Sequence, residues 1–182
     1  MGFQDPDLLH LERDGPTLSL RSRLFFFTSV AARKWKLYKG KLKLRRKKIL
    51  ILCTGNSCRS QMAEGFANHA GWNAFSAGTK PEVEVNPFAI KVMIEIGIDI
   101  SHHIPQSVNE YLEDDFDLVA TVCDNARESC PVFMGECNYN IHNGFTDPAN
   151  ATGNDAEIAE VYRKVRDEIR DWINNLSKVS NH

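Results

Sequence analysis

The sequence predicts an α/β protein: a three-layer sandwich whose central four-stranded parallel sheet carries helices on both faces. Short apolar runs, typical of buried strands, alternate with helix-like runs from residue 47 onward. One helix-like run has start and stop signals at its two ends, and the last one repeats apolar residues at helical spacing. Strands that alternate with helices favour a parallel sheet covered on both faces.

The first predicted elements are a strand, a helix and a second strand. Residues 48–53 (KILILC) are continuously apolar, which is typical of a strand buried on both faces. Residues 60–71 (SQMAEGFANHAG) predict a helix that ends at Gly71. Residues 72–78 (WNAFSAG) predict a short strand that ends at a turn.

The second predicted helix has the clearest boundaries. Asn86 is suited to be its N-cap, Pro87 to be its first residue, and Gly97 follows its end. A third helix, two strands and a long final helix are predicted over residues 107–115, 117–123, 137–142 and 155–176. The apolar face predicted for the final helix comprises Ile158, Val161, Val165, Ile169, Trp172, Ile173 and Leu176.

Charge divides the chain into two parts. Residues 1–48 hold 13 Lys and Arg against 4 Asp and Glu, whereas the rest of the chain is acidic and the net charge is -2. We therefore predict a basic N-terminal extension over residues 1–46, disordered or irregular, and a catalytic domain over residues 47–178. The basic arm at 33–48 is interpreted as a solvated arm, a contact for nucleic acid or anionic lipid, or upstream sequence outside the normal product.

The apolar segments predict no membrane span, because none reaches spanning length. Residues 24–32 (LFFFTSVAA) faintly resemble a signal-peptide core, but the basic run that follows them would resist translocation. A cytoplasmic setting is therefore predicted. Thiols stay reduced there, so the five cysteines are interpreted first as chemical groups.

The turn after the first strand (CTGNSCRS) predicts an oxyanion site. Successive backbone N–H groups in a tight turn form a nest for an anion, and the helix that follows adds its positive N-terminal end. Arg59 can grip two oxygens of a tetrahedral anion such as phosphate or arsenate. The residues expected to bind the oxyanion are Thr54, Gly55, Asn56, Ser57, Cys58, Arg59 and Ser60.

Cys53 is the candidate nucleophile because it is the first residue after the strand, beneath the expected anion. The N–H groups and the helix end favour its thiolate form. The alternative is a buried structural cysteine at a strand end. The Cys-x5-Arg spacing to Arg59, between a strand and a helix, favours the nucleophile. A Walker nucleotide loop is not predicted, because its GxxxxGK[ST] pattern is absent.

These residues carry a family resemblance. Cys-x5-Arg between a first strand and a first helix resembles the low-molecular-weight protein tyrosine phosphatase fold, and CTGNSCRSQMAEG resembles the thioredoxin-coupled arsenate reductases of that fold. The segments SAG, NP, DIS, GFTDPA and VRDEI follow in family order, so the resemblance runs from about residue 47 to residue 175. It implies reduction of arsenate to arsenite, in arsenic detoxification.

The resemblance also implies a general acid. Asp147, in GFTDPA, matches the family's proton donor for the departing oxygen. Related phosphatases commonly follow this Asp-Pro pair with Tyr, which packs beside an aryl substrate. This chain has Ala149 there, which favours a substrate other than phosphotyrosine.

Two further cysteines, Cys123 and Cys130, predict a redox relay. A second thiol at Cys123 would attack Cys53 to form a disulfide, and Cys130 would then attack Cys123 and free Cys53. The resemblance assigns this three-thiol pattern to the branch that thioredoxin recharges; a glutaredoxin donor remains an alternative. A zinc site with His102 or His103 is disfavoured, because ligands at matching spacing are missing.

Two cysteines have no required redox role in the resemblance. Cys58 is interpreted as structural, or as an accidental disulfide partner of Cys53, and Cys137 as a small apolar residue.

Some relatives bind potassium beside the nest. Asn56, Glu64 and Ser76 match three of the positions used, but the fourth, an Asp in those relatives, is Gln106 here. An amide is a poorer cation partner than a carboxylate, so the sequence predicts no cofactor and leaves potassium as the alternative.

Two other functions stay open at this stage. One is a small phosphatase that uses Cys53, Arg59 and Asp147 without Cys130; the other is a non-catalytic regulator that binds an anion or a partner through the basic arm. The expected partners are arsenate and thioredoxin, with no membrane, no nucleic acid unless through residues 33–48, and a monomeric chain.

Overall fold

In the computed structural model, the described residues are 46–122, 133 and 135–179. They belong to one compact unit of the chain, Arg46–His182. The predicted extension over residues 1–46 lies almost wholly outside the described residues, so it stays a prediction. Within the described part of the chain, no helix is long and apolar enough to cross a membrane.

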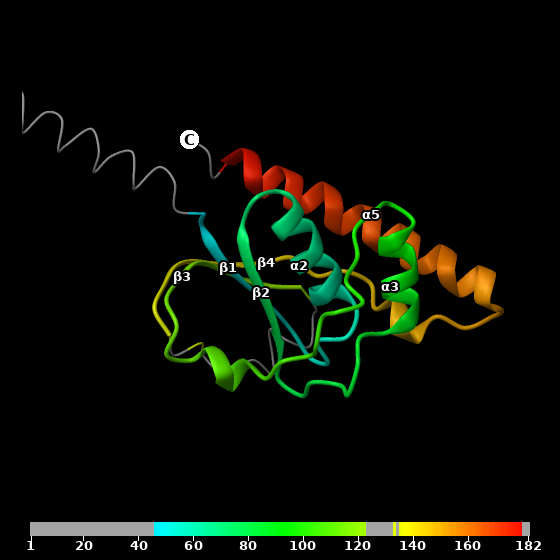
Figure 1. The fold of residues 1–182 in the computed structure, drawn as a ribbon, viewed down its shortest axis with the longest axis horizontal. Coiled ribbons are helices and arrows are strands. Elements are labelled where there is room, and N and C mark those ends of the chain that lie inside the picture. Colours follow the sequence, from blue (N-terminus) through cyan, green and yellow to red (C-terminus); the bar gives the residue numbers. More distant parts are fainter. Residues whose placement is uncertain (1–45, 123–132, 134, 180–182) are drawn as a thin grey trace, which may run out of the picture. The chain divides into compact units, whose positions relative to one another are not determined.

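The predicted four-stranded parallel sheet is confirmed (Figure 1). Its strands lie in the order β2-β1-β3-β4. Their bounds are Lys48–Cys53 for β1, Asn73–Gly78 for β2, Phe116–Thr121 for β3 and Cys137–His142 for β4. Because all neighbours are parallel, the carboxyl ends of the strands meet at one edge, where the candidate turn begins.

Strand β1 is buried on both faces, as its continuous apolar sequence predicts. Ile49, Ile51 and Cys53 belong to the larger hydrophobic core, and Leu50 and Leu52 belong to a smaller core on the other face. Both sets follow the two-residue alternation of a strand. The nucleophile candidate therefore sits at the end of the most deeply buried strand of the sheet.

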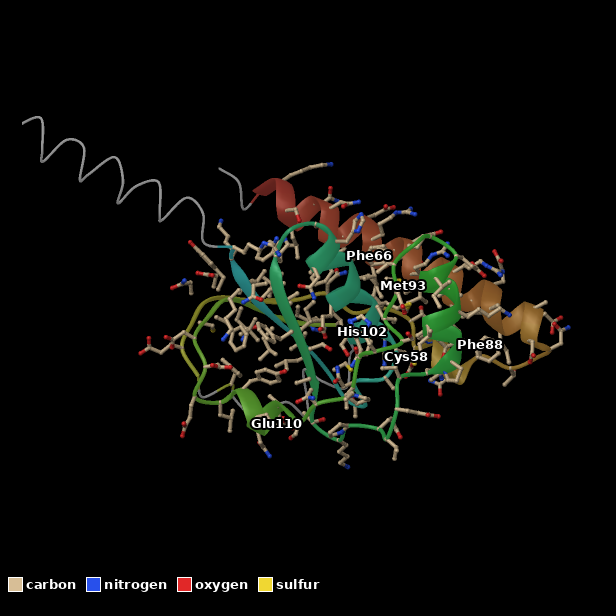
Figure 2. All side chains as sticks on the ribbon, in the orientation of Figure 1. Cys58, Phe66, Phe88, Met93, His102 and Glu110 are labelled. Atoms are coloured by element: carbon tan, nitrogen blue, oxygen red, sulfur yellow. The ribbon has the colours of Figure 1, made fainter. Side chains whose placement is uncertain are left out.

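Three helices cover the face of the larger core. They are α2 (Arg59–His69), α3 (Pro87–Ile94) and α5 (Asp155–Val179), and α5 contacts both α2 and α3. Phe66 of α2 and Met93 of α3, labelled in Figure 2, belong to this core. The predicted N-cap of α3 is confirmed, because the Asn86 side chain accepts a bond from the Phe88 N–H at 2.9 Å.

The opposite face is packed by η1 (Val108–Tyr111), a short 3-10 helix. Ser107 caps it through a capping box with Glu110. The longer helix predicted over 107–115 is therefore wrong in extent. The acidic run after Leu112 offers no apolar side chain at helical spacing, and the chain instead leads directly into β3.

The face of α5 also needs a correction. Val161, predicted to lie on the apolar face, is only half-buried, whereas Tyr162 is 1% exposed and belongs to the core. Tyr162 lies four residues after Ile158 and three before Val165, and Val161 lies three after Ile158 and four before Val165, so this spacing alone does not separate the two. The Tyr162 hydroxyl has a polar partner inside the protein, because it lies 3.4 Å from the sulfur of Cys58.

Candidate active site

The turn between β1 and α2 has its carbonyl groups anchored on the outside. The N–H groups of Thr79, Lys80 and Glu82 donate to the carbonyls of Cys53, Thr54 and Gly55 at 3.2, 2.9 and 2.8 Å. The Gln61 side chain holds the carbonyl of Asn56 at 3.0 Å, and the Asn86 N–H holds that of Ser57 at 2.9 Å. All five carbonyls of residues 53–57 are thus occupied from outside the turn.

This anchoring aims the N–H groups inward. In a trans peptide unit the C=O and N–H bonds point in opposite directions, so the N–H groups of residues 54–58 face the inside of the turn. Helix α2 begins directly afterwards, and no side chain caps its start. The predicted nest is therefore built from aligned backbone donors and a helix N-terminus, which together favour an anion.

Gly78 allows the supporting segment to come close. A β-carbon at Gly78 would lie 2.5 Å from the carbonyl oxygen of Thr54, and real β-carbons essentially never approach so closely. A side chain there would push the end of β2 away from the turn. The glycine of the SAG segment thus has a steric role that the sequence alone did not assign.

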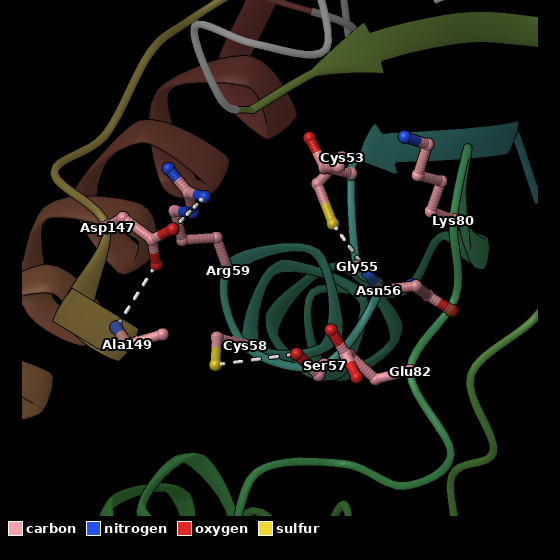
Figure 3. Close-up of a pocket in the computed structure, with 11 residues that line it drawn as sticks. Cys53, Gly55, Asn56, Ser57, Cys58, Arg59, Lys80, Glu82, Asp147 and Ala149 are labelled. Carbon is pink, nitrogen blue, oxygen red and sulfur yellow. Dashed lines mark hydrogen bonds and ion pairs between the residues drawn. The ribbon is translucent and has the colours of Figure 1, made fainter.

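The sulfur of Cys53 lies inside this turn and already accepts backbone donation. The Asn56 N–H is 3.0 Å from the sulfur, and the Ser60 hydroxyl is 2.9 Å from it. Figure 3 shows the sulfur directed toward Asn56. Hydrogen bonds of this kind stabilise the charged form of an acceptor, which is the form a nucleophile needs.

Arg59 and Asp147 meet on the other side of the pocket (Figure 3). Their side chains form an ion pair at 2.9 Å, and Arg59 also donates to the Phe145 carbonyl at 3.0 Å. Asp147 precedes the 3-10 helix η2 (Pro148–Asn150), and its other oxygen accepts the Ala149 N–H at 3.1 Å. The two residues predicted from motifs far apart in the sequence thus line one site.

These residues share one pocket of about 290 Å³. Its lining comprises Cys53, Thr54, Gly55, Asn56, Ser57, Cys58, Arg59, Lys80, Glu82, Asp147 and Ala149. Sequence reasoning missed Lys80 and Glu82, which come from the segment after β2. Their position follows from the hydrogen bonds between that segment and the turn, and no local motif marks it.

Cys58 also lines the pocket, but its sulfur is buried against Tyr162, whose hydroxyl is 3.4 Å away. Burial raises the pKa of the Cys58 thiol, although the bonds from Tyr162 and Ser57 oppose that shift. Burial likewise raises the pKa of the Tyr162 hydroxyl. Cys58 is therefore held as a neutral thiol, in keeping with the structural role predicted for it.

Asn56 joins the nest to a buried polar network. It has a positive φ of 48°, and its side-chain N–H groups donate to Ser60 and Ser76 at 2.9 and 2.7 Å. Ser76 in turn donates to Glu64 at 2.6 Å. Burial raises the pKa of Glu64 to about 7, although its bonds to Ser76 oppose the shift.

This network is a poor fit for potassium. The side-chain oxygen of Asn56 already accepts bonds from the Gln61 side chain and from the Gln106 N–H, at 3.1 and 2.7 Å. The Ser76 hydroxyl both accepts and donates. The three matching side chains, Asn56, Glu64 and Ser76, are thus all engaged in hydrogen bonds within the network.

Cys123 and Cys130 lie outside the described residues. The last described residue before Cys123 is Val122, whose N–H donates to the carbonyl of Leu52 at 2.9 Å. Leu52 directly precedes Cys53. The end of β3 therefore lies beside the end of β1, the strand whose last residue is Cys53. Among the described residues, Cys53, Cys58 and Cys137 are not in disulfide bonds.

Comparison with known proteins gives a consistent result. The family model for low molecular weight phosphotyrosine protein phosphatases matches residues 48–181. An arsenate reductase of Halalkalibacterium halodurans is 46% identical over 129 residues, which are 69% of this chain and 91% of the relative. An arsenate reductase of Bacillus subtilis is 43% identical over 129 residues, with the same shares of the two chains.

A solved structure of an arsenate reductase in the phosphate-binding state is also similar. The TM-score is 0.63 at 32% sequence identity, and the match covers 72% of this chain and 97% of that one.

Proposed function

Because the chain belongs to the low molecular weight phosphotyrosine protein phosphatase family, we propose that it is an arsenate reductase with Cys53 as its nucleophile. The observation that carries the proposal is the position of the Cys53 sulfur. It accepts the Asn56 N–H within a turn whose other N–H groups also face inward, across the pocket from Arg59. The arsenate reductases found among the relatives support arsenate as the substrate.

In the first step, arsenate binds the inward N–H groups and the Arg59 guanidinium. The Cys53 thiolate attacks arsenic, a sulfur–arsenic bond forms and an arsenic–oxygen bond breaks. Asp147 supplies a proton to the departing oxygen, which leaves as water or hydroxide. Arsenic is still As(V) in this adduct. The shared pocket of Cys53, Arg59 and Asp147 supports this assignment, because it places a carboxyl group and an anion ligand beside the nucleophile.

In the second step, the Cys123 thiolate attacks the sulfur of Cys53. A disulfide forms, the sulfur–arsenic bond breaks and its electron pair stays on arsenic, which leaves as arsenite. Cys130 then attacks Cys123, which frees Cys53 and leaves a Cys123–Cys130 disulfide. The hydrogen bond from Val122 to Leu52 supports Cys123 as the attacking thiol. Val122 directly precedes Cys123, and Leu52 directly precedes Cys53.

The oxidised pair needs an external dithiol. We propose thioredoxin as this reductant, with glutaredoxin as the alternative, and a monomeric enzyme in the cytoplasm, where thiols are kept reduced. Neither nucleic acid nor a membrane has a part in the reaction.

The test is arsenite production by the purified chain, with thioredoxin and with glutaredoxin supplied separately. We expect multiple turnovers with thioredoxin, and loss of all turnover in Cys53→Ser. Cys130→Ser should complete about one turnover and then stop, with Cys53 bound to Cys123. Full multiple turnover by Cys130→Ser with thioredoxin would refute the relay.

A second candidate is phosphatase activity, which the family match favours. It would use Cys53, Arg59 and Asp147 and would not need Cys130. Hydrolysis of p-nitrophenyl phosphate at equal rates by the wild type and Cys130→Ser, without arsenite production by either, would favour this candidate. Slow hydrolysis beside arsenate reduction is compatible with the first proposal.

A further inference from the structure

We propose that His103 is a positioning residue for the pocket: it fixes the side-chain amide of Gln61, which in turn holds Asn56 in the conformation that aims its N–H at Cys53. This inference rests on the proposed role of Cys53 as the nucleophile. The three links are described contacts, from the His103 ring to Gln61, from Gln61 to Asn56, and from Asn56 to the sulfur.

The orientation of the Gln61 amide follows from its partners. Its nitrogen donates to both the carbonyl oxygen and the side-chain oxygen of Asn56, at 3.0 and 3.1 Å. Its oxygen lies 2.8 Å from Nδ1 of His103. Since an amide oxygen can only accept, Nδ1 of the imidazole must carry the hydrogen.

A flipped Gln61 amide would disrupt the nest. Its oxygen would then face two oxygens of Asn56, so two hydrogen bonds would become contacts between acceptors. Gln61 is 1% exposed, so water has little access to replace the lost bonds. The His103 donor opposes the flip, because it needs the amide oxygen on its own side.

Asn56 depends on this support. Its φ of 48° lies in the left-handed region, which is disfavoured for a residue with a β-carbon. The Gln61 side chain and the Gln106 N–H hold it there through three hydrogen bonds to its two oxygens. If Asn56 relaxed, its N–H would turn away from the sulfur, and the inward N–H groups on either side would lose their alignment.

The contact does not require a charged imidazole. Burial and the neighbouring His102 lower the pKa of His103, with Asp99 acting in the opposite direction. The ring of His102, which is labelled in Figure 2, packs edge-on against that of His103, and the two ring centroids are 4.8 Å apart. A neutral imidazole with its hydrogen on Nδ1 and an imidazolium both donate from Nδ1, so the positioning persists across the neutral pH range.

The experiment compares His103→Asn with His103→Leu. Asn carries an N–H donor at the same position along the side chain as Nδ1, whereas Leu fills the space without a donor. The probes are the rate of Cys53 alkylation by iodoacetamide at pH 7 and the protection that inorganic phosphate gives. We expect Leu to slow alkylation and to weaken phosphate protection about tenfold, and Asn to restore both to within about threefold of the wild type.

A merely structural role would give another pattern. Both variants would then melt at lower temperature, while the Cys53 rate in the folded protein stayed at the wild-type value, and this outcome would overturn the proposal. Nitrogen NMR of the His103 ring in the wild type gives a second test that does not depend on the variants folding. A hydrogen on Nδ1 is expected, and a neutral ring with its hydrogen on Nε2 would refute the contact.

These probes separate the inference from the proposed function. Alkylation needs no arsenate turnover, so a wild type with a reactive Cys53 that does not reduce arsenate would reject the reductase alone. A wild type whose Cys53 reacts no faster than an unfolded cysteine would reject the nucleophile, and with it the role given to His103.

Discussion

Asn56 is the residue on which most of the site geometry depends. It is fully buried, has a positive φ, and contacts Cys53, Ser60, Ser76 and Gln61. Its backbone favours glycine, while its side chain supplies hydrogen bonds that glycine lacks. These two contributions can be separated by substitution.

We predict that Asn56→Ala destabilises the fold by about 3 kcal/mol and Asn56→Gly by about 2 kcal/mol. Both variants lose the side-chain bonds, but only alanine also retains the strain of the left-handed conformation, which costs about 1 kcal/mol. Urea unfolding at neutral pH measures the two values. Equal stability of the two variants would show that the backbone of residue 56 is unstrained.

Cys58 should react slowly although it lines the same pocket as Cys53. Burial raises the pKa of its thiol, so the reactive thiolate becomes abundant only at higher pH than for an ordinary cysteine. We predict at least about tenfold slower alkylation of Cys58 than of Cys53 at pH 7, and a smaller difference as pH rises. Peptide mass spectrometry over a time course measures both. Modification of Cys58 first would contradict the structural role.

The sequence was sufficient to predict site residues that lie close together in the chain or belong to a recognisable motif. Cys53 and Arg59 lie in one turn, and Asp147 was found through the family resemblance, so the pocket could be expected to contain all three. Gln61 and His103 could not be found in this way, because their contact joins positions 42 apart through packing alone. A buried amide on the apolar side of a helix was the one available signal, and only the structure shows its partner.

At the scale of elements, α2 must pack closely against the segment after α3. A β-carbon at Gly65 would lie 2.8 Å from Ile100 and 3.1 Å from Met93. Alanine would gain about 1 kcal/mol of helix propensity but would overpack this contact, at a cost of about 1–3 kcal/mol. The steric cost should exceed the gain, because both neighbours are fully buried.

We therefore predict that Gly65→Ala lowers the free energy of unfolding by about 1 kcal/mol, net of the gain in propensity. Asn174→Ala, at an exposed position of α5, is the matched control, where alanine gains propensity without a clash. Urea unfolding compares the two. Stabilisation by Gly65→Ala of the size seen in the control would mean that α2 can move away from Ile100.

The boundaries of helices and strands were predictable where a capping residue or the spacing of apolar residues marked them. Asn86, Pro87 and Gly97 bound α3 correctly, and Gly97 has the positive φ of 78° that suits glycine. The helix after Ser107 was overestimated because its capping box marks only a start. How far that element extends depends on the apolar surface available on the sheet, which the local sequence does not reveal.

At the scale of the whole molecule, the buried network beside the nest predicts how the enzyme responds to cations. The Asn56 oxygen accepts two hydrogen bonds, and the Ser76 hydroxyl is engaged on both sides. We expect initial rates of arsenate reduction in KCl and NaCl of equal ionic strength to agree within about twofold. Saturable activation by potassium alone, beyond about threefold, would show that the network rearranges to bind it.

In the proposed reaction Cys53 bonds to arsenic, and Cys123 and Cys130 then supply the two electrons that reduce it. The most direct measurement adds one equivalent of arsenate to the fully reduced chain without any reductant, and then counts free thiols and maps disulfides by mass spectrometry. We expect two thiols to be lost, one arsenite to be released, and a disulfide to join Cys123 to Cys130. An unchanged thiol count after incubation, with all arsenic still present as arsenate, would contradict it.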